Sequence, residues 1–568
     1  MATIATDLEK NPVGIPWIHT TDDWGRPWCD AASDFYDRLD DQRQHLARHG
    51  LPADQMDFAV GTEHALQKVF RTKLWFRGDM SGSVRLQAAR GEYESFQLVV
   101  CPIADEERTL TKLSDEKTQG NGTLKAKTVT IRSVEVSDLR HAETSYQIDA
   151  GHIQIYNVGY IKTVSAQYPT MHVGAWPDPL LPSEVFEVAN PNCQPVWVEV
   201  KVPEDAPAGN YRGQVVVSGP HDVRIDINLE VWDFSLPKPP SMSMGWSLHG
   251  WFAKDGVDKL LERLTVLLEH RLAPWHAAYP HHTKPEDHDR IMSFLLDRGV
   301  NVQFTSEKPT AAFVEHLRKK DWLKHYVCVW GDEPHERDYD EYRSRTEQVH
   351  EAFPGLAVGM TETPTPDNAG LFDVWIPEPT TQNDAWVQDA LRRGDRVWWY
   401  LCQLPIHARY HGPIHACPGM VVDRPAIDHR ITYWLAFKQG IEGVAYWAIS
   451  SWPPDFERWP DDPWPPNPLA KFPYSGQHNA NGFLCYPGTD GLPWPSIRLK
   501  CIRDGLEDYD YLRLLRELSN EAPRDSSRRL LDLPPELAMG LRYYNKDPNV
   551  LIRMREKVAR EIVELSRK

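Results

Sequence analysis

The chain contains little cysteine and no long apolar run. Its 568 residues include eight Cys, which are scattered and form no CxxC pair. This pattern argues against a disulfide framework and against a zinc site built from paired cysteines. No stretch approaches the roughly 20 apolar residues of a membrane-spanning helix, and Met1–Lys10 has neither a basic start nor an apolar core. We therefore expect a cytoplasmic protein, with a secreted protein whose signal peptide has been removed as the alternative.

Basic residues are also in deficit. The 81 acidic residues exceed the 63 Lys and Arg, so the formal net charge is −18. A field of this sign repels phosphates, so neither nucleic acid nor an anionic membrane is an expected partner. Aromatic residues are abundant instead, with 22 Trp, 21 Tyr and 17 Phe. Such rings can stack on the apolar faces of sugars, although filling a core is their commoner use.

The length of the chain and the changes in residue pattern along it predict several domains. Residues 1–65 are polar, with one possible helix at 34–49. Residues 66–238 contain short alternating strands broken by turn signals such as Asn121-Gly122, which predicts a β-sandwich. Closely spaced prolines at 237–240 mark a linker, because proline interrupts both helices and sheet ladders.

Strand and helix patterns alternate from residue 239 to residue 518. Eight short apolar runs have the character of buried strands, and helical patterns lie between most of them. The expected strands are 242–247, 273–276, 300–304, 326–330, 357–360, 373–376, 397–402 and 444–448, and the expected helices include 259–270, 288–298, 311–320, 339–353 and 426–438. Eight strands with crossovers predict a (β/α)8 TIM barrel, with a doubly wound open sheet as the alternative. The GxGxxG turn of a dinucleotide fold is absent at the first strand.

A long loop and a helical end complete the predicted architecture. Residues 450–495 are rich in Pro and Trp and leave the rim of the predicted barrel, so they could close over a glycan or form a rigid cover that only packs. Residues 496–518 have the amphipathic pattern of a closing helix. Residues 519–568 form a separate C-terminal segment of charged helices.

Two adjacent acids end the fourth predicted barrel strand, in Tyr326-Val327-Cys328-Val329-Trp330-Gly331-Asp332-Glu333-Pro334. Catalytic groups of (β/α)8 barrels lie at the C-terminal ends of the strands, so Asp332 and Glu333 are the candidate catalytic residues. An Asp-Glu pair can also serve as a cap and a solvated acid, but the flanking residues favour a site. Neighbouring strand residues point to opposite faces unless the backbone bends, and Gly331 and Pro334 could supply that bend.

Aromatic residues near other strand ends are candidates for substrate binding. Trp398, Tyr400 and Trp447 lie in or near strands seven and eight and could form a platform for a sugar, and Tyr400 could also donate a hydrogen bond to the substrate. His249 after the first strand and Trp275 in the second are weaker candidates. Each ring taken alone has a more common use in the core.

Two further acids could supply a second carboxylate. Glu362 follows the fifth predicted strand and Glu378 follows the sixth, and a loop ion pair or cap is the ordinary use of each. Either could act as a second catalytic carboxylate beside the acids at 332 and 333. No constellation of metal ligands stands out, and we expect neither a metal nor a cofactor.

Several segments resemble glycoside hydrolase family 123 and the related domain of unknown function family 4091. The likeness runs roughly from Arg77 to Leu515. It is carried by Ala89-Arg90-Gly91-Glu92-Tyr93-Glu94-Ser95-Phe96-Gln97, Pro203-Glu204-Asp205-Ala206-Pro207-Ala208-Gly209, Trp330-Gly331-Asp332-Glu333-Pro334, Gly482-Phe483-Leu484-Cys485-Tyr486-Pro487-Gly488 and Arg503-Asp504-Gly505-Leu506-Glu507-Asp508-Tyr509.

The resemblance implies a β-sandwich, a catalytic barrel and a retaining exo-β-N-acetylgalactosaminidase acting on a glycan or glycoconjugate with terminal β-linked GalNAc. The substrate's own acetamido oxygen would then attack and form an oxazolinium ion. Asp332 would orient the 2-acetamido group, and Glu333 would be the general acid/base. Two alternatives remain open, namely a glycosidase of the same scaffold that cleaves a non-acetamido glycan by double displacement, and a non-catalytic glycan-binding protein.

Overall fold

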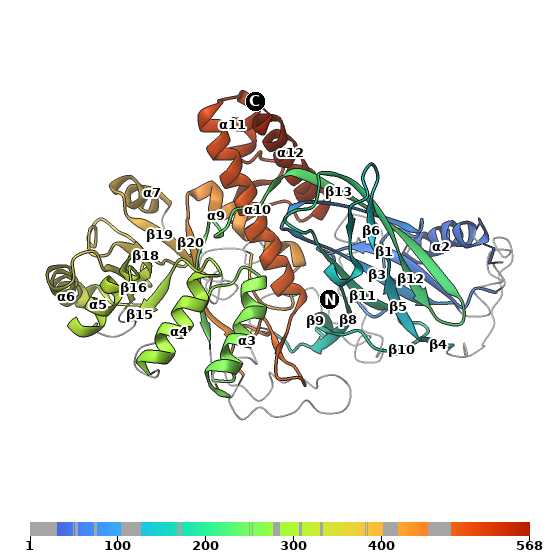
Figure 1. Ribbon diagram of the computed structural model, residues 1–568, viewed down its shortest axis with the longest axis horizontal. Helices are drawn as coiled ribbons and strands as arrows, with labels where there is room; N and C mark the ends of the chain where they lie inside the picture. The colour runs from blue at the N-terminus through green and yellow to red at the C-terminus, as the bar shows by residue number, and fades with distance from the viewer. Residues whose placement is uncertain are drawn as a thin grey trace, which may run out of the picture. The chain divides into compact units, whose positions relative to one another are not determined.

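The chain divides into two compact units, drawn in Figure 1 from a computed structural model. The first unit consists mainly of the chain up to Leu236, and the second consists mainly of the chain from Pro237 onward. The structure describes residues 31–48, 50–51, 55–72, 76–103, 127–166, 170, 173–248, 250–252, 254–275, 284–305, 309–329, 333–380, 382, 384–401, 418–452 and 479–567.

The first unit is the predicted β-sandwich. One sheet has the strand order β1-β3-β11-β8-β9, and the other has the order β2-β13-β12-β6-β7 with β5 also paired to β12. A separate pair joins β10 to β4. The strands are β1 (Phe58–His64), β2 (Ser83–Arg90), β3 (Tyr93–Pro102), β4 (Thr128–Ile131), β5 (Ser133–Val136), β6 (Leu139–His141), β7 (Gln147–Ile148), β8 (Ile153–Lys162), β9 (Ala175–Pro182), β10 (Phe186–Ala189), β11 (Gln194–Lys201), β12 (Gly209–Ser218) and β13 (Asp222–Ser235).

Alternating burial builds the core of the sandwich. Along β13 every second residue from Val223 to Val231 is buried, and these side chains join one apolar cluster with residues of the other sheet. Each fully buried aliphatic side chain of this kind contributes roughly 1.5–3 kcal/mol to folding. The sandwich also includes β1, which pairs with β3 along its whole length. It therefore starts within the N-terminal segment predicted for residues 1–65, which also holds helix α2 (Ala31–Arg48).

The second unit is built around a parallel barrel, as predicted. Seven strands follow the order β14-β20-β19-β18-β17-β16-β15, and every neighbouring pair is parallel. The strands are β14 (Ser243–Leu248), β15 (Gln303–Thr305), β16 (Tyr326–Val329), β17 (Ala357–Met360), β18 (Val374–Trp375), β19 (Arg396–Tyr400) and β20 (Gly443–Ser450).

Between β14 and β15 the ring closes through Pro274 and Trp275. The Trp275 N–H donates to the Trp246 carbonyl (3.1 Å), and the Phe304 N–H donates to the Trp275 carbonyl (2.7 Å). Trp275 thus links β14 to β15 at the place of the second predicted strand, 273–276. The described part of this strand forms a parallel bridge between Pro274 and Trp246, and His276 lies outside the described residues.

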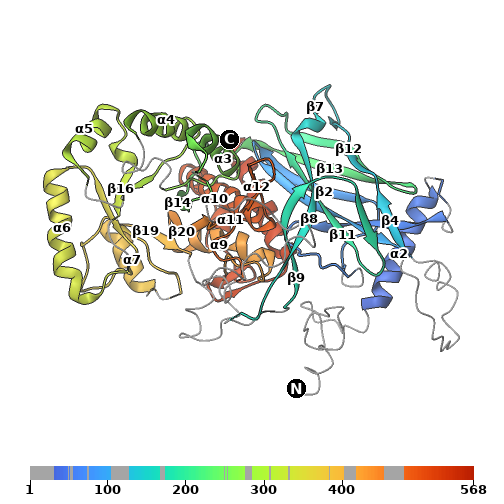
Figure 2. The same ribbon diagram turned by 90° about the horizontal axis from the view of Figure 1, so that it is seen from below.

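Helices surround the barrel strands, and Figure 2 shows α4, α5, α6 and α7 outside them. Their bounds are close to the predicted ones, except that α7 was not among the predicted helices. The helices are α3 (Gly256–Glu269), α4 (Pro285–Leu296), α5 (Ala311–Lys319), α6 (Tyr339–Ala352), α7 (Asp384–Arg393) and α9 (Ala426–Gln439). This arrangement leaves the C-terminal ends of the parallel strands together at one rim, where the site is expected.

The barrel interior is filled with side chains. Its apolar cluster takes residues from β15, β16, β18, β19 and β20, with Trp398 as a fully buried member. Gly443 lies opposite Trp398 in the sheet, and a Cβ atom at this glycine would come within 2.5 Å of the indole ring. The indole therefore occupies the space that any larger residue at 443 would need.

The C-terminal end is helical, as predicted. The helices α10 (Ile497–Glu521), α11 (Asp525–Leu531) and α12 (Pro548–Ser566) pack against one another, and α10 also packs against α9 (Figure 1). Of the long loop 450–495, residues 453–478 lie outside the described residues, so its predicted closure over a glycan stays a prediction. Among the described helices, none combines the length and the apolar character needed to cross a membrane.

Candidate active site

Glu333 lies just beyond the C-terminal end of β16. Its φ of 45° falls in the left-handed region, which costs an ordinary residue about 1–2 kcal/mol. The Glu333 N–H donates to the Thr361 hydroxyl oxygen (3.1 Å), and Thr361 directly follows the neighbouring strand β17. A strained backbone held by an adjacent strand is typical of functional sites. The bend expected at the acid pair therefore includes Glu333 itself; Asp332 lies outside the described residues.

Glu362 lies beside Glu333 at the same rim. Its side chain is half-buried, and one carboxylate oxygen accepts the Thr363 N–H (2.6 Å). Burial raises the pKa of Glu362, and the negative charges of Glu333 and Glu336 raise it further, against the lowering effect of the Thr363 hydrogen bond. The carboxylates that follow β16 and β17 thus interact electrostatically. A carboxyl group in such surroundings holds its proton to higher pH than a solvated one.

Glu378, the other candidate for a second carboxylate, is placed differently. It follows β18, which is two strands away from β16 in the sheet. Its backbone carbonyl accepts the Gln382 N–H (3.1 Å), so this segment forms a turn toward α7. Among the described residues, Glu362 therefore interacts with Glu333, whereas Glu378 lies one strand further away in the sheet.

Trp398 belongs to the core of the barrel. Its indole is fully buried and stacks on Phe304, with ring centroids 5.5 Å apart and planes 14° from parallel. Trp275 stacks on Phe304 as well, at 4.9 Å and 30°. This burial corrects the expectation that Trp398 forms part of a sugar platform, because a fully enclosed ring offers no face to a ligand. Trp275 is only half-buried but belongs to the same stack.

Tyr400 and Trp447 remain as candidates at the rim, because both are half-buried and lie at or near the C-terminal ends of β19 and β20. Trp447 packs closely over Gly482, where a Cβ atom would lie 2.4 Å from the ring. The Tyr446 hydroxyl accepts the Gly482 N–H (2.8 Å) and donates to Asn481 Oδ1 (2.7 Å). The segment at 481–482 therefore holds Trp447 in place, a role that residue spacing alone did not indicate.

Two family models match this chain. The model of the glycoside hydrolase 123 catalytic domain matches residues 268–515, and that of the glycoside hydrolase 123 N-terminal domain matches residues 115–219. Together these matches cover more than half of the sequence. The chain belongs to glycoside hydrolase family 123.

One solved structure shares the fold of this chain. A family 123 glycoside hydrolase from Clostridium perfringens, described for glycolipid glycan hydrolysis, aligns with a TM-score of 0.65 and 14% identity over 90% of this chain and 100% of its own. At this identity the likeness shows the fold. A family 2 glycosyl hydrolase from Bacteroides cellulosilyticus, at 13% identity, aligns over 64% of this chain and 44% of its own with a TM-score of 0.21, too low to carry an argument. No curated protein matches the chain.

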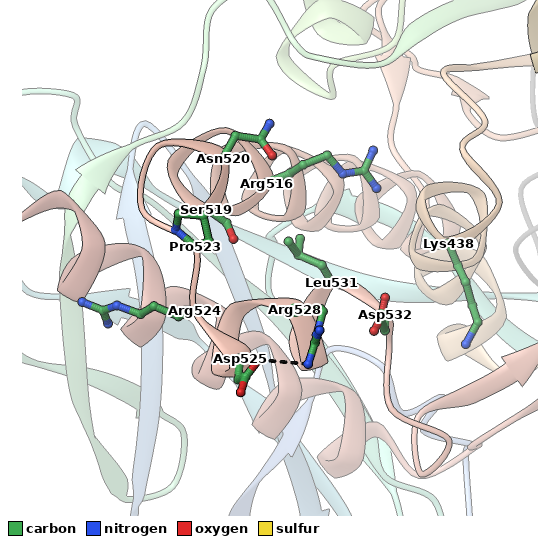
Figure 3. A pocket seen from close by; sticks show the side chains of 10 residues that line it. All are labelled: Lys438, Arg516, Ser519, Asn520, Pro523, Arg524, Asp525, Arg528, Leu531 and Asp532. Carbon is green, nitrogen blue, oxygen red and sulfur yellow. Dashed lines mark hydrogen bonds and ion pairs between the residues drawn. The ribbon is translucent and has the colours of Figure 1, made fainter. Parts of the chain in front are cut away.

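The remaining predicted site residue, His249, lies outside the described residues of this family 123 protein. A cavity of about 990 Å³ opens away from the rim, between α10, α11 and the end of α9 (Figure 3). Two of its arginines already form ion pairs within the protein. Arg528 pairs with Asp525 (2.9 Å), and Arg524 pairs with Glu564 (3.2 Å). We therefore assign the candidate site to the barrel rim and not to this cavity.

Proposed function

We propose that this family 123 glycoside hydrolase is a retaining exo-β-N-acetylgalactosaminidase that uses the substrate's 2-acetamido group as its nucleophile. The observation that carries the proposal is the placement of Glu333 directly after β16, in a left-handed turn beside a second, half-buried acid. Family membership supports the fold and the hydrolase class. The glycolipid glycan hydrolysis described for the Clostridium perfringens relative supports a glycoconjugate substrate.

The proposed reaction has two steps. In the first, Glu333 gives its proton to the glycosidic oxygen while the acetamido oxygen attacks the anomeric carbon, so the aglycone leaves and an oxazolinium ion forms. Asp332 holds the acetamide N–H and stabilises the developing positive charge. In the second step, the Glu333 carboxylate takes a proton from water as the water opens the oxazolinium ring, which gives a product of retained configuration. No carboxylate of the protein needs to bond to the sugar.

The ionisation of Glu362 bears on the choice between this route and double displacement. A carboxylate nucleophile must be ionised, and retaining enzymes of that kind place it about 5–5.5 Å from the acid. Burial and the negative charge of Glu333 raise the pKa of Glu362, which works against its use as an ionised nucleophile. The same residue would nevertheless be the nucleophile of the alternative, a glycosidase acting on a non-acetamido glycan.

A glycoside panel with one inhibitor tests the proposal. We expect nitrophenyl β-GalNAc to be the best aryl glycoside, a thiazoline analogue of the oxazolinium ion to inhibit competitively, and Asp332→Asn to lose nearly all activity. Hydrolysis rates and inhibition constants give the readout. Faster cleavage of a sugar without the acetamido group, with no binding of the thiazoline, would exclude substrate assistance. A preparation that binds sugar but cleaves none of the panel, with Glu333→Gln unchanged, would support a binding protein.

Thr361 provides a test of how Glu333 is positioned. Thr361→Val removes the acceptor for the Glu333 N–H, and the loss of one hydrogen bond of about 1 kcal/mol should loosen the turn. We expect kcat to fall roughly tenfold while KM stays nearly constant, because the acid is misplaced rather than the sugar. Thr361→Ser keeps the hydroxyl and should retain most of the activity. Equal kcat values for the Val and Ser variants would show that this hydrogen bond does not position the acid.

A further inference from the structure

Among the described residues, one group of three side chains has donor atoms close enough to hold a metal ion. His288 and Asp289 lie on α4, and His316 lies on α5. One potential ligand atom from each residue lies within 4.8 Å of the other two. Asp289 Oδ1 is 3.3 Å from His288 Nδ1 and 2.6 Å from His316 Nε2. Zinc bonds of roughly 2.0–2.2 Å at tetrahedral angles place ligand atoms about 3.4 Å apart, so small side-chain shifts would admit an ion.

The His288 ring lies between Tyr326 and Asp289. The Tyr326 hydroxyl lies 3.7 Å from Met292 Sδ, to which it donates, and 2.8 Å from His288 Nε2. The other ring nitrogen, Nδ1, lies 3.3 Å from Asp289 Oδ1. A metal ion bound at Nδ1 and the Asp289 carboxylate would replace the contact between them, while Nε2 keeps its contact with the Tyr326 hydroxyl.

The surroundings match those of known metal sites. A ligating histidine usually donates its other ring N–H to a second residue that fixes the tautomer, and Tyr326 occupies that place for His288. Aromatic rings form part of the wall, with Phe313 5.5 Å from the His288 ring and Trp322 6.2 Å from the His316 ring. Two imidazoles and one carboxylate form a ligand set suited to Zn²⁺ or Co²⁺.

We propose that His288, Asp289 and His316 form a site for a divalent cation of the zinc class that links α4 to α5. A water molecule completes the four-coordinate shell. The site lies on two outer helices and shares no residue with the proposed glycosidase site, so it does not depend on the proposed glycosidase chemistry. Its role is to join two neighbouring helices, and Tyr326 connects it to the start of β16.

The charge of Lys320 should weaken metal binding at this site. Its ammonium group lies 2.9 Å from Asp289 Oδ2 and balances the carboxylate charge in the absence of a metal. A cation at Oδ1 would be repelled by that ammonium group. Lys320→Met should therefore tighten metal binding several-fold, while Lys319→Met on the same turn of α5 should leave it unchanged. This direction distinguishes a metal site from a simple hydrogen-bond network.

Cobalt titration of the full-length protein tests the proposal. After removal of metals with a chelator, we expect the protein to bind one Co²⁺ per chain with the visible d–d absorption of a four-coordinate site. His316→Ala and Asp289→Asn should abolish that signal, and Tyr326→Phe should weaken binding roughly 10–100-fold. His350→Ala is the matched control, because His350 pairs with Asp373 (2.8 Å) without a second histidine.

Three outcomes would overturn the proposal. They are the absence of stoichiometric Co²⁺ binding at micromolar concentrations, equal binding by the His316→Ala variant, and a loss of binding in Lys320→Met. If His316→Ala fails to fold, Tyr326→Phe and Lys320→Met still decide, since they are expected to move the affinity in opposite directions. Zinc should also raise the melting temperature of the chelated wild type and leave that of Asp289→Asn unchanged.

Discussion

Glu333→Gln should lower kcat/KM for a GalNAc glycoside with a poor leaving group by roughly 10²–10⁴-fold. The change keeps the size of the side chain but removes the proton that the departing oxygen needs. With nitrophenyl β-GalNAc the loss in the first step should be much smaller, because nitrophenolate leaves without protonation. Michaelis–Menten kinetics on an alkyl glycoside and on the nitrophenyl glycoside measure the difference. This dependence on the leaving group identifies a general acid more sharply than a loss of activity does.

Glu336→Gln is the matched control for this prediction. Glu336 is an exposed acid three residues further along the chain, and its charge also acts on Glu362. We expect only a small change, because Glu336 is not placed to reach the leaving group in the proposed mechanism. An equal loss on both glycosides for Glu333→Gln would mean that Glu333 is not the proton donor. If Glu362→Gln instead showed the dependence on the leaving group, the acid would be Glu362.

Most barrel strands could be predicted because each is a short apolar run with a clear end. The predicted strand at 326–330 corresponds to β16, which ends at Val329, and the strand at 357–360 has the bounds of β17. The second predicted strand, 273–276, is described only as far as Trp275, where its backbone bonds to Trp246 and Phe304. The strand β1 was not predicted, because its partner β3 lies about 35 residues later and supplies the context that makes it a strand.

The depth of each aromatic ring in the barrel could not be predicted. Trp398 and Trp447 both lie near strand ends in the sequence, yet Trp398 is fully buried and Trp447 is only half-buried. The register between β19 and β20 places Trp398 opposite Gly443 and Tyr400 opposite Ala445. Register is a property of paired strands, so a pattern within one strand does not contain it.

The motifs that resemble family 123 serve packing as well as chemistry. In the sandwich, Gly91 has a φ of 79° at the turn between β2 and β3, and the Glu92 carboxylate accepts the Ala89 N–H (2.5 Å). In the closing motif, a Cβ atom at Gly505 would lie 2.4 Å from the Tyr433 ring, so α10 approaches α9 closely there. Such residues specify the architecture, which explains why the resemblance indicated the fold more firmly than the substrate.

Asp508→Asn should lower the free energy of unfolding of the barrel unit by roughly 3–5 kcal/mol. Asp508 on α10 is fully buried and accepts two hydrogen bonds from Arg430 on α9, at 2.6 and 2.8 Å. It also lies 3.1 Å from Arg555 Nε on α12 and accepts the Trp434 indole N–H (2.8 Å). The substitution therefore removes the carboxylate that two buried guanidinium groups share. An uncompensated buried charge of this kind is among the costliest single changes in a folded protein.

The exposed ion pair between Arg528 and Asp525 is the matched control. Their side chains are 71% and 76% exposed, so Asp525→Asn should change the free energy of unfolding by no more than about 1 kcal/mol. Urea denaturation followed by tryptophan fluorescence compares the two variants through their midpoints at unchanged m. A shift for Asp508→Asn no larger than that of the control would contradict the prediction.

The kinetics of Asp508→Asn separate stability from chemistry. α9 leads directly into β20, which carries Trp447, so loosening the contact between α9 and α10 acts on the barrel as a whole. We expect total activity to fall with the fraction of folded protein while KM and the activity per folded molecule stay unchanged. Glu333→Gln should give the opposite result, with an unchanged midpoint and a lower kcat. A loss of kcat per folded molecule in Asp508→Asn would show that the buried charges also shape the active site.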